Sequence, residues 1–163
     1  TGVQTCALPI CTATASTTGS TIDFLSIPSW VKRITVMFNG VSTVAAVDYL
    51  VQLGVGSTPT FTASGYLANS ASTTGTAATL STAGFLIFNP AVATGLSGAV
   101  TLTQFDASAF KWVETHAMGR SDNNNVIVGG GAATLSGAVT AVRITTIGAA
   151  TTFDAGSINV FYE

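Results

Sequence analysis

The chain has 163 residues, of which only 7% are charged, and its formal net charge is -2. Five lysines and arginines in total are too few to neutralise a nucleic-acid backbone, which excludes nucleic acid as a partner. A hydrophobic content of 47% with this low charge is not typical of disorder, and no apolar run approaches the roughly 20 residues that cross a bilayer. We therefore expect a folded domain without membrane insertion.

The first eleven residues, TGVQTCALPIC, differ in composition from the rest and hold both cysteines, Cys6 and Cys11. Back-translation of Thr1 to Ile10 gives a string that resembles a common sequencing adapter, with one base left over that begins the codon of Cys11. We interpret residues 1–11 as a disordered adapter artefact, so the native N-terminus and any upstream domain are expected to be missing. The alternative is a natural arm that contains a disulfide.

Residues 12–163 show the two-residue period of β-strands. In SWVKRITVMFNG, Trp30, Ile34, Val36 and Phe38 share one face, and Asn-Gly ends the run. The later runs are also rich in β-branched and aromatic residues and are separated by Gly, Ser, Thr or Asn: VDYLVQLG, FLIFN, AVTLTQF, AFKWVETHAM, NVIVG, VRITTI and SINVFYE.

This pattern predicts one all-β domain over residues 12–163, an antiparallel two-sheet sandwich of jelly-roll type. An immunoglobulin-like sandwich is the alternative. Residues 54–83 and 119–137 are rich in Gly, Ser, Thr and Asn, which predicts surface loops. The last strand, INVFYE, is apolar on both faces, as expected of a central or subunit-facing strand.

Residues for catalysis or metal binding are scarce. The chain has one histidine, His116, and its seven carboxylates are scattered singly, so no paired acid and base and no metal site is predicted. GRSDNNN at 119–125 lacks the acidic residue that closes a calcium loop, and GGG at 129–131 lacks the lysine of a phosphate loop. We interpret these two stretches as a polar hairpin loop and a flexible turn, and we expect no cofactor.

IPSWVKRITVMFNGVST, YLVQLG and the ending VRITTIGAATTFDAGSINVFYE resemble a C-terminal domain of tail-fibre-like and other virion structural proteins of phages and prophages. The resemblance covers both ends of the stretch from Ile22 to Glu163. It implies a trimeric, β-rich appendage or capsid-surface module on the virion, which contacts other virion proteins.

The resulting hypothesis is a non-enzymatic, homotrimeric virion surface domain, such as a tail-fibre tip, that binds a host glycan or protein. The candidate contact residues are Trp112, as a stacking platform for a sugar, and His116, Arg120 and Asp122, as hydrogen-bond partners. The competing interpretation makes Trp112 a core residue, His116 part of a strand that leaves the core, and Arg120 a solvated loop charge.

Two other classes of protein fit the sequence. A carbohydrate-binding module of a secreted enzyme predicts sugar affinity from a monomer. A capsid decoration protein predicts binding to assembled shells and no glycan signal. A depolymerase would need carboxylates that cluster in the folded chain.

Overall fold

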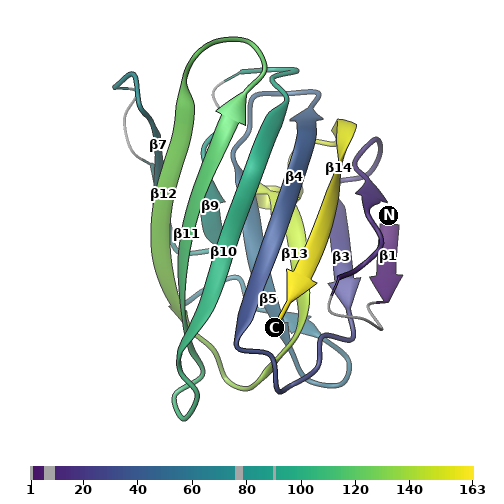
Figure 1. Ribbon diagram of the computed structural model, residues 1–163, viewed down its shortest axis with the longest axis vertical. Coiled ribbons are helices and arrows are strands. Elements are labelled where there is room, and N and C mark those ends of the chain that lie inside the picture. The colour runs from purple at the N-terminus through teal and green to yellow at the C-terminus, as the bar shows by residue number, and fades with distance from the viewer. Residues whose placement is uncertain (1, 6–9, 76–78, 90) are drawn as a thin grey trace.

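The computed structural model describes residues 2–5, 10–75, 79–89 and 91–163, and they form a sandwich of two β-sheets (Figure 1). The predicted all-β, two-sheet sandwich is confirmed. The elements in chain order are β1 (Gly2–Thr5), β2 (Thr14–Ala15), β3 (Thr21–Leu25), β4 (Arg33–Thr43), β5 (Tyr49–Val55), β6 (Thr60–Phe61), β7 (Tyr66–Ser72), β8 (Thr79–Ser81), β9 (Phe85–Ile87), β10 (Leu96–Asp106), β11 (Lys111–Arg120), β12 (Val126–Thr134), β13 (Val139–Thr146), the short 3-10 helix η1 (Ile147–Ala149) and β14 (Phe153–Tyr162).

The smaller sheet has the strand order β1-β3-β13-β5-β6, with β9 also paired to β5, and the larger sheet has the order β2-β14-β4-β10-β11-β12-β7-β8. All pairings between the described strands are antiparallel except that of β1 with β3. Figure 1 looks onto the larger sheet, where β12, β11, β10, β4 and β14 lie in front of β3, β13 and β5. Most connections cross between the sheets, whereas β10, β11 and β12 form a meander within the larger sheet.

The core lies between the sheets and is formed by the inward positions of alternating strands. In β4, Ile34, Val36 and Phe38 are buried, as the two-residue period predicts. Trp30 precedes this strand, is 58% exposed, and contacts Tyr162 edge-on with 6.0 Å between ring centroids. The buried hydrophobic side chains form a cluster that extends from the N-terminal region to β14. Burial of this kind contributes about 25 cal/mol per Å² of apolar surface.

The last strand, β14, lies between β4 and the two-residue β2 in the larger sheet. Ile158, Val160 and Tyr162 point inward and are buried, and Phe161 lies on the opposite face. This strand is paired on both sides and apolar on both faces, which fits a central position, one of the two positions predicted for it.

Two segments predicted as surface loops contain strands of the larger sheet. Residues 54–83 include β7, and residues 119–137 include β12, which also contains the Gly129–Gly131 run that we interpreted as a turn. The inward positions of β7 are Tyr66, Ala68, Ser70 and Ser72, all buried. Because two of the four are polar, the apolar alternation that marks a half-buried strand is weak in this segment.

The N-terminal stretch is partly ordered against the sandwich, although disorder is predicted for residues 1–11. Strand β1 pairs with β3, Ile10 bridges Phe161, and the backbone N–H of Cys11 donates to the carbonyl of Val160 at 2.8 Å. Residues 1 and 6–9 lie outside the described residues. The adapter interpretation concerns the encoding DNA and stays a prediction.

Candidate functional site

The strand predicted to carry the ligand, β11, turns its aromatic and ionisable side chains into the sandwich. Trp112, Glu114, His116 and Met118 share one face, and all four are buried. The Trp112 side chain is only 1% exposed. A ring at this depth offers no face to a sugar, so the predicted stacking role of Trp112 does not fit its position, and the core interpretation does.

Arg120 and Asp122 lie where β11 ends and the turn to β12 begins. Nε of Arg120 donates to Oδ1 of Asp122 at 2.9 Å, and the hydroxyl of Thr94 donates to Oδ2 at 3.2 Å. Hydrogen bonding from Arg120, aided by its charge and by Thr94, holds the pKa of Asp122 below its ordinary value. The Arg120 side chain is 8% exposed and Asp122 is 38% exposed, so the carboxylate is the more accessible partner.

The four predicted contact residues do not form one site. Trp112 and Arg120 stand near opposite ends of β11, eight residues and therefore about 26 Å apart along an extended strand. His116 lies between them, 6% exposed and pointing into the sandwich. Only Arg120 and Asp122 come together, as an ion pair on a hairpin.

His116 instead joins a buried chain of three polar side chains. Its Nδ1 donates to Oε1 of Glu114 at 2.7 Å, and its Nε2 lies 2.9 Å from Oγ of Ser70 on β7. A carboxylate on one imidazole nitrogen and a serine hydroxyl on the other is the connectivity of a serine-hydrolase triad. Glu114 is two residues from His116 on the same face of β11, but the sequence does not reveal the third member, because Ser70 meets His116 only through the pairing of β7, β12 and β11.

The environment of this triad does not resemble that of an activated nucleophile. Ser70 is 1% exposed and Glu114 is 2% exposed, and the N–H of Phe88 donates to Ser70 Oγ at 3.1 Å. Neither of the two surface hollows described below is lined by any of the three residues. Oε2 of Glu114 and Nε1 of Trp112 have no partner among the described residues. We assign these three side chains a structural role, because they link β7, β11 and the segment that follows β9.

A second polar cluster lies on the outer face of the smaller sheet. Arg143 on β13 stands between Asp23 on β3 and Gln52 on β5 in the strand register. Nε and Nη2 of Arg143 donate to the two carboxylate oxygens of Asp23 at 2.7 and 2.8 Å. The ring of Phe61 on β6 lies under the guanidinium carbon at 4.0 Å. The ion pair and the ring fix the cation in one orientation.

A hollow of about 310 Å³ opens over this cluster. Gln52 donates through Nε2 to the carbonyl of Ala83 at 2.8 Å, which leaves its Oε1 as an acceptor. Nη1 of Arg143 makes no hydrogen bond to the residues that the structure describes, so it remains a donor. The residues around the hollow are Thr21, Leu50, Gln52, Ala63, Ala83, Arg143, Thr145, Thr146, Gly148 and Ala149.

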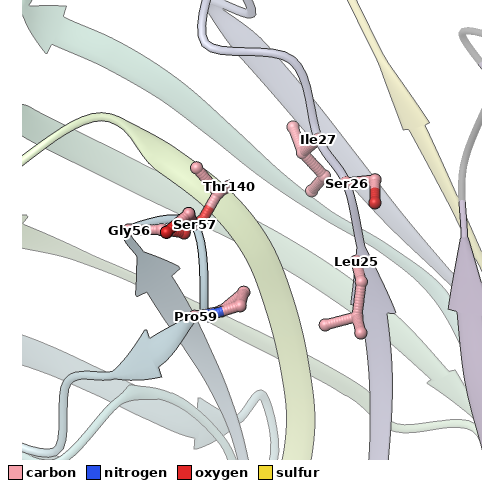
Figure 2. Close-up of a pocket in the computed structure, with 7 residues that line it drawn as sticks. All are labelled: Leu25, Ser26, Ile27, Gly56, Ser57, Pro59 and Thr140. Atoms are coloured by element: carbon pink, nitrogen blue, oxygen red, sulfur yellow. Dashed lines mark hydrogen bonds between the residues drawn. The ribbon is translucent and has the colours of Figure 1, made fainter.

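Another hollow, of about 300 Å³, lies near the other end of β13. Figure 2 shows its two sides, with Leu25, Ser26 and Ile27 facing Gly56, Ser57, Pro59 and Thr140. The hydroxyl of Thr140 donates to the carbonyl of Gly56 at 2.7 Å, which ties the 56–59 turn to β13. Its lining has hydroxyls and apolar side chains but no charge.

Together, the two hollows give the smaller sheet a polar, nearly neutral outer face. The hollow around Arg143 presents a donor, an acceptor and hydroxyls beside apolar side chains, a combination that suits a ligand rich in hydroxyl groups. A sequence signal for it exists, because Asp23 and Arg143 each interrupt an otherwise apolar strand run, TIDFL and VRITTI. Their pairing across 120 residues could not be predicted from either run alone.

The described part of the chain has no group of three or more His, Cys, Asp or Glu side chains placed to hold a metal ion. None of the helical structure in those residues is long and apolar enough to cross a lipid bilayer. Comparisons of the chain with models of protein families, with curated proteins and with solved structures found no match.

Proposed function

We propose that this chain is a non-enzymatic surface domain of a phage virion, a tail-fibre tip or a similar appendage, that assembles as a homotrimer and binds a glycan on the host cell. The proposal combines the resemblance of the strand motifs to virion proteins with the hollow around Arg143. The hollow is the observation that carries the binding part of the proposal.

The chemistry of the hollow favours a neutral or weakly charged sugar. Asp23 offsets the charge of Arg143, so the cluster has no net charge to attract a strong anion. Hydrogen bonding to Asp23 raises the pKa of Arg143, so Nη1 is a permanent donor at every physiological pH. A donor and an acceptor held on neighbouring strands can bind adjacent sugar hydroxyls in a fixed geometry.

The ligand site of this proposal differs from the site predicted by sequence. Of the four predicted residues, Asp122 is the accessible one, and it forms a separate hairpin surface together with its ion-pair partner Arg120. We keep this pair as a competing contact surface, and the variants in the Discussion separate it from the hollow.

The experiment that tests the function is a screen of the purified chain on arrays of bacterial surface polysaccharides. We expect binding to a restricted set of glycans, with the bound glycans recovered at unchanged mass after prolonged incubation. Release of shortened saccharides would overturn the non-enzymatic assignment. Absence of binding to every glycan by a folded protein would favour the capsid decoration protein over a receptor-binding tip.

The oligomeric state in solution distinguishes a carbohydrate-binding module from the proposed virion domain. Both bind sugar, but a module of a secreted enzyme is expected to be a monomer, whereas the proposed appendage is a trimer. Light scattering of the glycan-binding protein therefore distinguishes the two.

A further inference from the structure

The central part of the outer face of the larger sheet is a broad surface of uncharged residues. The register of the strands places one residue from each of six strands side by side in a row across the sheet. This row is Asn159, Met37, Ala99, Ala117, Val128 and Ala71. We call the region around it the flat face.

The next two rows toward the start of β11 are built from similar residues. The row beside the first contains Thr35, Thr101 and Thr115 on β4, β10 and β11. In the row after it, β11, β12 and β7 contribute Val113, Ala132 and Leu67, and β4 contributes Arg33 near the margin of the sheet. Lys111 lies one row further along β11, so these two charged side chains mark the margin of the face.

Several apolar side chains on this face are open to solvent in the single chain. Leu67 is 64% exposed, Leu80 is 62% exposed and Val128 is 41% exposed. Monomeric proteins rarely leave a continuous apolar patch of more than a few hundred Å² uncovered. An uncharged centre with charged residues at its margin is also how interfaces between proteins are built.

The size of the flat face suits a stable contact between proteins. From β14 to β7 the sheet has six strands, which at about 4.8 Å apart span roughly 24 Å. Seven residues along each of these strands add about 23 Å, so the projected area is roughly 550 Å². Side chains make the accessible area larger, and a standard interface buries about 800 Å² on each partner.

We propose that the flat face is covered by another copy of this chain. A surface without charge meets a copy of itself without like-charge repulsion and without the cost of desolvating ions. Threonine, alanine and glycine residues also let two sheets approach closely, because their side chains are small or absent. The proposal extends the homotrimer of the proposed function by naming the surface through which copies meet, and it is independent of what the hollow around Arg143 binds.

The test is the solution mass of the full chain and of three variants, measured by light scattering. Leu67→Asp and Val128→Asp place a carboxylate on the flat face, where it would be buried between copies. Val44→Asp is the matched control, since Val44 is 55% exposed and lies in the turn after β4, outside this face. Far-ultraviolet circular dichroism verifies that each variant is folded.

We expect the unaltered chain and Val44→Asp to have the same oligomeric mass, and both variants of the flat face to be folded monomers. A monomeric unaltered chain at concentrations of about 100 μM would overturn the proposal, and so would oligomers of unchanged mass for both face variants. An oligomer other than a trimer that dissociates in these variants would support the face and contradict the homotrimer. Glycan binding by the monomeric variants would show that the hollow around Arg143 binds glycan independently of assembly through the flat face.

Discussion

Asp23 and Arg143 are 120 residues apart in the chain, yet they form a two-point ion pair between neighbouring strands of the smaller sheet. The Asp23 side chain is 11% exposed and that of Arg143 is 30% exposed, so the pair is largely withdrawn from solvent. The ion pair fixes the guanidinium of Arg143, which lines the hollow, so it links the stability of the sheet to the proposed binding site.

Replacing only one partner of this pair is expected to be costly. Arg143→Ala leaves the Asp23 carboxylate almost buried without a cation, which we expect to lower the free energy of unfolding by about 2–4 kcal/mol. The double variant Asp23→Asn with Arg143→Gln removes both charges and is expected to recover at least half of that loss. Urea denaturation measures both proteins, and equal losses in the two would contradict this assignment.

The triad of Ser70, His116 and Glu114 is expected to stabilise the fold without catalysing hydrolysis. Ser70→Ala removes the acceptor of the Phe88 N–H and the partner of His116 Nε2, which we expect to cost about 1–3 kcal/mol. The unaltered protein should not hydrolyse activated esters above the rate in buffer. Ester turnover that disappears in Ser70→Ala would show that the triad is catalytic.

Gly129 is expected to be essential to this triad. A side chain at Gly129 would collide with the His116 ring and with the backbone carbonyl of Asn69. We expect Gly129→Ala to destabilise the protein by about 3 kcal/mol or to prevent folding. Gly137→Ala is the matched control, because nothing lies within 4 Å of an added Cβ there, and its melting temperature should differ little from that of the unaltered protein.

Asp48 is expected to make the protein less stable as pH rises. Burial raises the pKa of its carboxyl group, although the N–H of Asn89 donates to Oδ1 at 2.8 Å and opposes that rise. Because the pKa is higher in the folded state than in the unfolded state, the favourable contribution is present below the unfolded pKa and is lost as pH rises through the folded pKa.

Asp48→Asn keeps an acceptor for the Asn89 N–H and carries no charge. We expect this variant to melt at a higher temperature than the unaltered protein at pH 7, with the difference shrinking as the pH is lowered through the range where Asp48 takes up its proton. Thermal melts of the two proteins across pH 3–8, a range chosen to bracket ordinary carboxyl groups, provide the comparison. A constant difference over that range would contradict a role for Asp48 ionisation.

The strands that the sequence predicts best are those whose inward residues are large and apolar. In β4, Ile34, Val36 and Phe38 alternate with polar residues, and the structure buries all three. Strand β7 could not be predicted from apolar alternation, because Ser70 and Ser72 occupy two of its inward positions. Such serines are tolerated in the interior because they find hydrogen-bond partners, as Ser70 does with His116, and those partners come from distant strands.

The candidate site is harder to predict for the same reason. Trp112 and His116 were predicted as contact residues and share one face of β11, but periodicity alone does not say which face of a strand meets the core. The hollow around Arg143 depends on the register of β3, β13 and β5, which is set by the fold as a whole. The sequence signal for this hollow is the presence of single charged residues, such as Asp23, inside otherwise apolar strands.

The most direct test of the proposed receptor-binding role is the glycan-array signal of three variants compared with that of the unaltered chain. Ala63→Trp fills the hollow around Arg143 from an exposed position at its margin, and Ser64→Trp places the same side chain on the next exposed residue, which does not line the hollow. Arg120→Ala removes the competing hairpin ion pair. We predict that Ala63→Trp loses at least nine-tenths of the signal, an amount equivalent to roughly 1.4 kcal/mol of binding free energy, while Ser64→Trp and Arg120→Ala retain it. Full binding by Ala63→Trp, or loss of binding in Arg120→Ala alone, would contradict the assignment of the hollow as the glycan site.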